Sequence, residues 1–511
     1  MQGEFYIVQN LNSHPNGQHT IIKLWGGIFL YALLTGLALQ LVILPHVFPQ
    51  LHAGNGLLAG RDWIGFHNDA VIQANKIHLK GWSQFLLRPD GASAITGVTS
   101  FFYVIFGPNP WVLLPLNAAL FATGGVALFS MLRRLDLDDS EATIALMPYL
   151  FFPSALLQYG QIHKDVFCTA GVLVTLWAWV GLLRKDRKLS EIFPLLVISA
   201  VALILVSVFR PYFMFPFLGL GVGLLIWHIL RSGWQLIRLQ TNLNTEVNIA
   251  RLRFNFQSTA ILSVLCASVY VMSVSYLDLR FQPVGSDGIT SRFAIPVFSW
   301  RSNADVRSAD AARLFQEADE AARIKAIQEC RPIVILRDDA FIENTINRAF
   351  LKIAVARAGF TSSGGTTAAS NIDKSIDFCK NEDLIRYIPR AIQIALFAPF
   401  PSKWFSTEKR NSSSVEIYIS AVEMFYTYVA YIGLLYWLVI YRRWNIELLV
   451  PVAFAFGLTL LLGLTVANVG TLYRMRFPFA MIFISLGMAG LMQMAKIRPR
   501  WLERLDSNAD R

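Results

Sequence analysis

The sequence predicts an all-α polytopic membrane protein with about ten transmembrane helices. Of its 511 residues, 54% are hydrophobic and only 15% are charged, which is more apolar material than the core of a water-soluble domain can bury. The apolar residues come in runs of about 20, the length that spans the hydrocarbon of a bilayer. The net charge of +11 comes from Lys and Arg beside these runs, where they orient helices and contact anionic lipid. We therefore expect membrane lipid as a partner and no nucleic acid.

The apolar runs give the order of the predicted helices. The first run follows a polar stretch of about twenty residues. It is longer than the apolar core of a signal peptide and lacks a small-residue cleavage site, so we interpret it as a retained transmembrane helix. The predicted spans are residues 23–44, 111–132, 142–159, 166–183, 192–209, 212–230, 258–277, 415–441, 448–467 and 477–495.

The distribution of Lys and Arg predicts the orientation of these helices. The basic loops are residues 133–134, 184–188, 231–253, 442–443 and 496–504. All of them fall on one side if the N-terminus is on that side too, and by the positive-inside rule that side is the cytoplasm. We therefore expect an integral protein of the bacterial inner (plasma) membrane, with both termini cytoplasmic and every long polar element extracytoplasmic.

The spans divide the chain into three parts. Residues 1–277 form an N-terminal transmembrane module, and its first outer loop, residues 46–108, is the predicted catalytic loop. Residues 278–414 form an extracytoplasmic segment, and residues 415–511 hold the C-terminal transmembrane helices and a cytoplasmic tail.

Two short apolar pieces are predicted to lie along the outer face. Residues 94–107 end at Pro108, and residues 388–401 are bounded by prolines. Both pieces are too short to span a bilayer and proline interrupts helices. We therefore expect juxtamembrane helices that are interfacial or re-entrant.

Part of the outer segment has the pattern of polar and apolar residues that is typical of a soluble domain. Its apolar spacing predicts helices over residues 305–329 and 340–358 and a strand over residues 332–336. We expect a small α/β insertion that closes a cavity over the membrane part. Cys330 and Cys379 lie in this segment, where an oxidising compartment permits a disulfide, and the sequence leaves that pairing open.

A polar stretch at residues 60–91 carries two carboxylates, Asp62 and Asp69, seven residues apart. A helix returns to nearly the same face after seven residues, so both acids can look into one cleft, although an ordinary amphipathic surface helix has the same spacing. A carboxylate at the membrane surface can act as a general base, and Asp69 is the first choice before Asp62. His67 could bind a divalent metal together with Asp69, but such a pair is more often joined by a hydrogen bond. No cofactor is certain.

Cations from distant parts of the chain are predicted to meet on the outer face, where positive charge is scarce. They form a candidate clamp for a phosphate or pyrophosphate. Alternatively, they extend to lipid phosphates or pair with loop carboxylates. These residues are His163, Lys164, Arg210, Arg474 and Arg476.

Glu423 lies within an apolar run, where an acid is a functional candidate. It is a candidate cavity acid, and the alternative is that it pairs with a structural arginine. The chain contains no GxxxxGK[ST], HExxH or CxxC pattern and no GxSxG elbow. A phosphate loop, a zinc hydrolase, a redox dithiol and a serine hydrolase are therefore not indicated.

The order of several motifs resembles the GT-C class of polyprenyl-phosphate-sugar-dependent glycosyltransferases, which includes protein O-mannosyltransferases and the aminoarabinose transferase of lipid A. The motifs are GRDWIGFHNDA, GVTSFFYVIFGPNPWVLLPLNAAL, PSALLQYGQIHKD, FRP and LYRMRFPFAMIFISLGMAGL. The best of them cover about the first 230 residues. The resemblance implies that Asp69 or Asp62 is the base and that Lys164, Arg210 and Arg474 bind the phosphate. The chain departs from the class in lacking an adjacent pair of acids and in placing its large outer segment late.

The resemblance implies a glycosyltransferase that moves a sugar from a polyprenyl-phosphate donor to a glycan, lipid or protein acceptor. The reaction is expected to be a direct, inverting displacement at the extracytoplasmic face with a carboxylate base. Alternatives are an O-antigen or exopolysaccharide polymerase or ligase that uses polyprenyl-pyrophosphate glycans, and a lipid or solute transporter. A structural assembly subunit is a further alternative.

Overall fold

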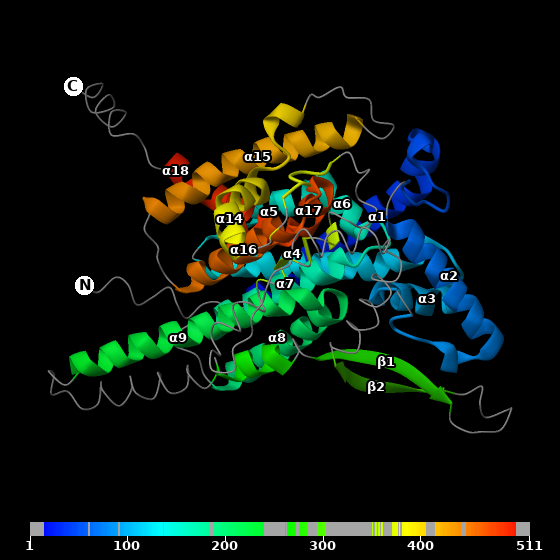
Figure 1. The fold of residues 1–511 in the computed structure, drawn as a ribbon, viewed down its shortest axis with the longest axis horizontal. Coiled ribbons are helices and arrows are strands. Elements are labelled where there is room, and N and C mark those ends of the chain that lie inside the picture. The colour runs from blue at the N-terminus through cyan, green and yellow to red at the C-terminus, as the bar shows by residue number, and fades with distance from the viewer. Residues whose placement is uncertain are drawn as a thin grey trace.

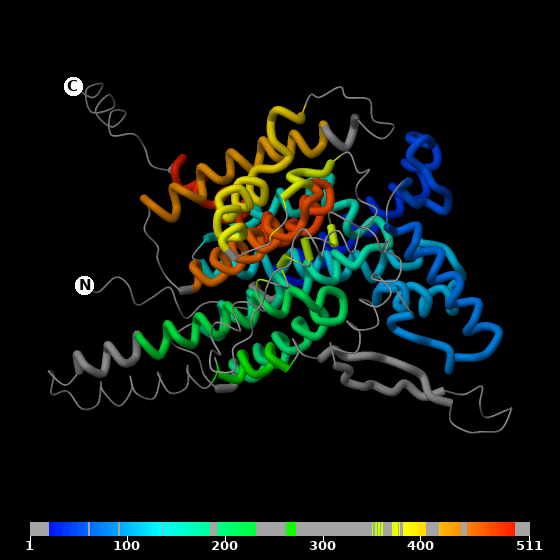
Figure 2. Tube along the Cα trace, in the orientation of Figure 1, coloured from blue at the N-terminus to red at the C-terminus, as the bar shows by residue number. Residues whose placement is uncertain are grey.

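The computed structural model describes most of the chain as a bundle of helices (Figure 1). It describes residues 15–239 except 60–61, 90–91, 136 and 184–188, parts of 261–302 and of 350–378, and residues 381–404, 414–440 and 446–496. The N-terminal half, blue to green, and the C-terminal helices, yellow to red, pack against each other in one bundle (Figure 2).

Eight helices in the described part of the chain are long and apolar enough to cross a membrane. Integral membrane character is thereby confirmed, and eight of the predicted spans are found as single helices. The helices of these spans are α1 (Pro15–Ala38) continuing into the π-helix η1 (Leu39–Val47), α4 (Leu114–Arg134) preceded by η4 (Pro110–Leu113), α7 (Asp165–Leu182), α8 (Leu189–Phe209), α9 (Met214–Leu239) preceded by η5 (Pro211–Phe213), α15 (Ser414–Val439), α16 (Ile446–Thr465) and α18 (Phe477–Lys496).

The predicted span at residues 142–159 is broken into two helices. These are α5 (Asp139–Phe151) and α6 (Pro153–Tyr159), which meet at an angle of 68°. The break occurs because Pro153 disfavours helical backbone at the residue before it, and Phe152 is extended with ψ 126°. Counted as one bent span, this pair brings the number of candidate spans among the described residues to nine.

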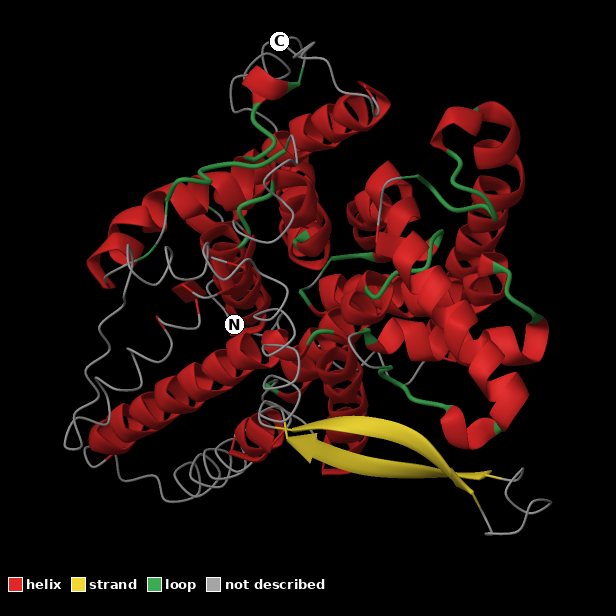
Figure 3. Cartoon of the chain, turned by 45° about the vertical axis from the view of Figure 1, so that its right-hand side comes forward, coloured by secondary structure: helices red, strands yellow, loops and turns green. Residues whose placement is uncertain are grey.

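In the predicted span at residues 258–277, residues 261 and 263–271 are helical among those described, but its last residues are not. Strand β1 (Ser275–Pro283) begins there and pairs antiparallel with β2 (Ala294–Ser302), so that Ser275 lies opposite Ser302. This hairpin lies at the edge of the helices (Figure 3). The predicted helix 305–329, the predicted strand 332–336, Cys330 and Cys379 lie outside the described residues.

Shorter helices lie at one end of the bundle. The two N-terminal ones, α2 (Asp62–Lys80) and α3 (Ala94–Phe106), pack side by side (Figure 1). The predicted short helix at 94–107 is thus confirmed, whereas the piece at 388–401 belongs to a longer helix, α14 (Asn381–Phe397), that begins earlier. α17 (Val469–Met475) precedes α18, and single 3-10 turns form η2 (Pro49–Leu51), η3 (Trp82–Gln84) and η8 (Pro401–Lys403).

Helix α7 is the centre of the bundle. Its span is 89% buried, and it contacts α4, α8, α16 and α18. A helix that is apolar on every side, as α7 is, can be surrounded by other helices. Its N-terminal residue, Asp165, is therefore placed at the middle of one end of the bundle.

Helices α15 and α18 approach each other closely because small residues face each other. A Cβ on Gly487 would lie 2.0 Å from the carbonyl oxygen of Ala430, and one on Gly433 would lie 2.1 Å from that of Gly487. Small residues at such crossings allow backbones to pack directly in membranes.

We predict that Gly487→Ala destabilises the protein. The added methyl group has no room beside the Ala430 carbonyl, so the two helices must separate, at a cost of about 1–3 kcal/mol. Thermal unfolding in detergent micelles should show a lower Tm than wild type. Gly457→Ala on α16 is the control, since no atom lies within 4 Å of its new Cβ. Equal melting temperatures for both variants would contradict close packing of α15 on α18.

Candidate functional site

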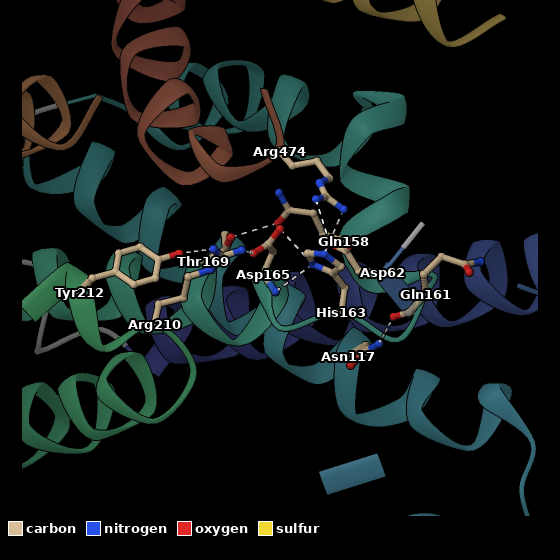
Figure 4. Close-up of polar contacts among 10 residues, drawn as sticks. All are labelled: Asp62, Asn117, Gln158, Gln161, His163, Asp165, Thr169, Arg210, Tyr212 and Arg474. Carbon is tan, nitrogen blue, oxygen red and sulfur yellow. Dashed lines mark hydrogen bonds and ion pairs between the residues drawn. The ribbon is translucent and has the colours of Figure 1, made fainter. Parts of the chain in front are cut away.

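Charged side chains from four separate parts of the chain converge at the N-terminal end of α7 (Figure 4). They come from the start of α2, the turn before α7, the junction of α8 with η5, and α17. We call this group the charge cluster. Its members are Asp62, His163, Lys164, Asp165, Arg210 and Arg474.

A buried ion pair lies at the inner end of the charge cluster. Arg210 donates through Nη2 to Oδ1 of Asp165 and through Nη1 to the hydroxyl of Tyr212. The side chains of Arg210 and Asp165 are only 8% and 6% exposed. Burial opposes the charge of Arg210, but the Asp165 carboxylate outweighs this effect and raises the pKa of Arg210. The Arg210 charge is therefore permanent, and its hydrogen bonds are directed to protein groups.

His163 connects this pair to Arg474. Its Nδ1 lies 2.9 Å from Oδ2 of Asp165 and 3.2 Å from the Asp165 backbone nitrogen. The Asp165 backbone N–H donates to Nδ1, and Oδ2 of Asp165 has no hydrogen-bond partner among the described residues. Burial lowers the pKa of His163 more than Asp165 raises it, so the ring is neutral near pH 7. Nε2 lies 3.4 Å from Nη1 of Arg474, within hydrogen-bond distance of that guanidinium.

Arg474 pairs with Asp62 at the open side of the charge cluster. Its Nη2 lies 3.1 Å from Oδ2 of Asp62, and the two side chains are 17% and 59% exposed. Its buried Nε has no hydrogen-bond partner among the described residues. A pair of this exposure is worth about 1 kcal/mol or less. Arg474 can therefore exchange Asp62 for another anion at little cost.

Lys164 is the cation of the charge cluster that has no anionic partner. Among the described residues its half-buried ammonium has no hydrogen bond or ion pair, and it lies 5.8 Å from the ring centre of Phe66. Burial and the charge of Arg210 lower the pKa of Lys164 to about 8, although Asp165 and Asp62 oppose the shift. At neutral pH most of it is still protonated.

The charge cluster carries one excess positive charge at neutral pH. Its cations are Lys164, Arg210 and Arg474, while its anions are Asp62 and Asp165. The excess belongs to Lys164, whose three N–H donors are not used by described residues. This arrangement can bind an anion such as a phosphate, because ionised donors form short, strong hydrogen bonds to phosphate oxygens.

The structure separates the two acids of α2. Asp62 contacts the cations, whereas Asp69 is exposed and has no hydrogen bond or ion pair among the described residues. Seven residues correspond to roughly 10 Å along a helix, so only the first turn of α2 reaches the charge cluster. Both acids were predicted as base candidates, and the geometry brings only Asp62 to the predicted phosphate-binding residues.

His67 uses both ring nitrogens within the protein. The amide nitrogen of Asn55 lies 3.3 Å from Nε2, which must accept because an amide nitrogen only donates. Nδ1, 2.7 Å from the Tyr103 hydroxyl, is then the donor. Burial lowers the pKa of His67, which keeps the ring neutral. The geometry therefore does not support a metal held by His67 and Asp69, and the described residues contain no group of three His, Cys, Asp or Glu arranged for a metal.

Arg476 lies outside the charge cluster, although it was predicted to bind phosphate. Its buried side chain donates through Nη1 to the carbonyl of Ala395, 2.6 Å away, and through Nη2 to the sulfur of Met424. It therefore fastens α14 and α15 to the start of α18.

Glu423, the predicted cavity acid, is 2% exposed and makes two hydrogen bonds within the protein. Its carboxylate accepts from the backbone N–H of Ser154 and from the Tyr473 hydroxyl. Neither of its direct partners is therefore an arginine. Arg476 lies close enough for its charge to act electrostatically on the Glu423 carboxyl group.

Asp165 is the member of the charge cluster that the sequence analysis did not select as a site residue. It followed two predicted phosphate-binding residues, and it stands at the start of an apolar span. An acid in that place requires a partner, and this signal could have identified it. Tyr212, two residues after Arg210, gave no such signal.

The fold and the charge cluster define a polytopic membrane protein with an anion-binding arrangement at one end of its bundle. No protein-family model and no curated protein matches the chain. Its function is therefore argued from the site.

We predict that Lys164 reacts with amine reagents at lower pH than an ordinary lysine, whose pKa is about 10.4. Competitive acylation from pH 6 to 11, quantified by mass spectrometry, should give a midpoint near 8 for Lys164, with the exposed Lys76 as the internal reference. Asp62→Asn should lower the midpoint because a carboxylate is removed, and Arg474→Gln should raise it because a cation is removed. Midpoints that do not move in these directions would contradict the geometry of the charge cluster.

Proposed function

We propose that this protein is a membrane glycosyltransferase that takes a sugar from a polyprenyl-phosphate donor and transfers it to an acceptor hydroxyl. The observation that carries the proposal is the charge cluster, in which Lys164 and Arg474 have donors for an anion beside the exposed carboxylate of Asp62. A sugar phosphate bound at a membrane surface requires both features: cations for the departing phosphate and a base for the incoming hydroxyl.

The cations of the charge cluster would have different roles. Lys164 offers an ammonium that is not engaged by described residues, and Arg474 can give up its exposed pair with Asp62. Arg210 is directed to Asp165 and Tyr212 and would contribute its charge rather than new hydrogen bonds. We assign the direct phosphate contacts to Lys164 and Arg474.

Asp62 would be the general base. When Arg474 turns to the phosphate, Asp62 loses its ion pair and becomes free to accept a proton. It removes the proton from the acceptor hydroxyl while that oxygen attacks the anomeric carbon. The bond from that carbon to the phosphate oxygen breaks on the opposite face, so the configuration inverts and polyprenyl phosphate leaves. Asp62 is therefore the preferred candidate for the base and Asp69 the second, which reverses the order of preference inferred from the sequence.

The arrangement of charge along α7 supports an extracytoplasmic site. Arg134 donates to the carbonyl of Trp177 near the C-terminal end of α7, whereas the charge cluster lies at its N-terminal end. The 18 residues of α7 separate the two ends by roughly 27 Å. Since Arg133 and Arg134 belong to the basic loops, the positive-inside rule assigns their end to the cytoplasm. The charge cluster and the reaction then belong to the opposite face of a bacterial inner membrane.

We predict that Asp62→Asn abolishes sugar transfer and that Asp69→Asn does not. Removing a general base typically lowers the rate by about 10²–10⁴-fold. The assay is transfer of radiolabelled sugar from polyprenyl-phosphate donors by purified protein in liposomes, with folding checked by thermal shift. Asp69→Asn is the matched control on the same helix.

Other outcomes of this assay identify other functions. Loss of activity in Asp69→Asn alone would restore Asp69 as the base. Transfer from polyprenyl-pyrophosphate glycans only would indicate a polymerase or ligase. No transfer from any donor, together with lipid or solute flux into liposomes, would indicate a transporter.

We predict that the donor KM rises as the pH increases above about 8. Only the protonated ammonium of Lys164 binds the phosphate, and its lowered pKa means that the free enzyme loses this charge as the pH rises through that value. The increase should not exceed about tenfold per pH unit. In Lys164→Arg the guanidinium remains charged throughout, so its KM should not change between pH 7 and 9. A wild-type KM that is independent of pH would exclude Lys164 as a phosphate ligand.

A further inference from the structure

The buried carboxylate of Glu423 joins parts of the chain that are far apart in the sequence. Its Oε1 accepts a hydrogen bond of 2.7 Å from the backbone N–H of Ser154, and its Oε2 accepts from the hydroxyl of Tyr473. The partners lie 269 and 50 residues away from it. Glu423 has no ion pair among the described residues, so these hydrogen bonds are its direct partners.

Each partner belongs to a short helix that leads to one side of the charge cluster. Ser154 is in the first turn of α6, which ends at Tyr159 a few residues before His163 and Lys164. Tyr473 lies in α17, and the next residue is Arg474. Glu423 thus contacts both segments whose side chains face each other across the proposed phosphate site.

Neighbouring contacts strengthen each connection. On the first side, the Phe152 ring packs against Tyr426, 5.6 Å between ring centres, one turn along α15 from Glu423. On the second side, the Arg476 guanidinium lies 5.1 Å from the ring centre of Tyr473. The first turn of α17 is held separately, because the Asn468 side chain accepts from the N–H of Thr471. The Tyr473 hydroxyl therefore holds the turn that carries Arg474.

We propose that Glu423 is a positioning residue that fixes Arg474 at the correct distance from His163 and Lys164. If α17 moved away from α6, one of the two hydrogen bonds would break and leave a buried polar oxygen without a partner, which is unfavourable. The backbone of α17 therefore stays in place while the Arg474 side chain exchanges Asp62 for the phosphate. This role rests on the proposed function only in that the anion is taken to be a polyprenyl phosphate.

The test compares variants that remove one or both hydrogen bonds. Tyr473→Phe removes the hydroxyl, and Glu423→Leu removes both acceptors at similar volume. Glu423→Gln is the conservative variant, because its amide oxygen can accept from Ser154 and its amide nitrogen can donate to the Tyr473 oxygen. Tyr428→Phe is the matched control. It removes a hydroxyl of α15 that donates to the carbonyl of Phe397, 2.6 Å away, and leaves α17 untouched.

Two measurements are made on each full-length variant. The first is the Kd for decaprenyl phosphate in mixed micelles. The second is amide hydrogen exchange of residues 469–476 without added lipid, read by mass spectrometry. We expect Glu423→Leu and Tyr473→Phe each to raise the Kd about tenfold and to speed amide exchange of residues 469–476. In the double variant, the two effects on Kd should not be additive. Glu423→Gln and Tyr428→Phe should stay close to wild type in both measurements.

Several results would overturn the inference. Unchanged exchange of residues 469–476 in Glu423→Leu and Tyr473→Phe would show that Glu423 does not hold α17. Faster exchange with unchanged Kd would show that it holds α17 without positioning the site. A loss in Glu423→Gln as large as in Glu423→Leu would show that its charge, not its geometry, matters. If wild type binds no decaprenyl phosphate, the proposed function fails, and the exchange data alone decide whether Glu423 holds α17.

Discussion

The ion pair between Asp165 and Arg210 is the interaction on which the candidate site depends. A carboxylate at the start of a central, apolar helix cannot remain charged without partners. Arg210 donates to one of its oxygens, and Nδ1 of His163 lies 2.9 Å from the other. His163 is in turn within hydrogen-bond distance of Arg474, which pairs with Asp62. One buried acid therefore connects α7 to the junction of α8 with η5, and through His163 to α17 and α2.

The alternation of charge in this chain of contacts explains why a cation is left over. In this series of contacts each carboxylate pairs with one arginine, and the ring of His163 between the two pairs is neutral. The charges of the two ion pairs therefore cancel. Lys164 is adjacent to the buried pair but does not enter it, and its positive charge is the remainder. Lysine suits this position better than arginine in one respect, since its pKa responds to burial and neighbouring charge. The site can thus be sensitive to pH near neutrality, although its other cations are permanent.

Hydropathy was sufficient to predict most of the membrane part of the fold. Eight spans appear as single helices where apolar runs of spanning length were found. The break between α5 and α6 was missed even though Pro148 and Pro153 stand in the sequence, because hydropathy averaged over a span does not register a proline. The hairpin of β1 and β2 was missed because an apolar run leading into residue 275 has the composition of a helix end as well as of a strand.

Most of the charged residues of the site could be predicted from the sequence, but which of them contact one another could not. Arg474 and Arg476 illustrate the reason: both were assigned to phosphate, yet residues two apart on a helical turn do not face the same way. Arg474 reaches Asp62 and His163, while Arg476 reaches the carbonyl of Ala395 on α14. In the same way Asp62 and Asp69 share a helix, and only one lies next to the cations. The net charge that a site offers to a ligand depends on which of its charged side chains are already paired. That pairing is determined by the packing of helices that are distant in sequence. A count of outer-face cations therefore overstates the positive charge that a substrate meets, which here reduces to Lys164 and to the guanidinium that Asp62 can release.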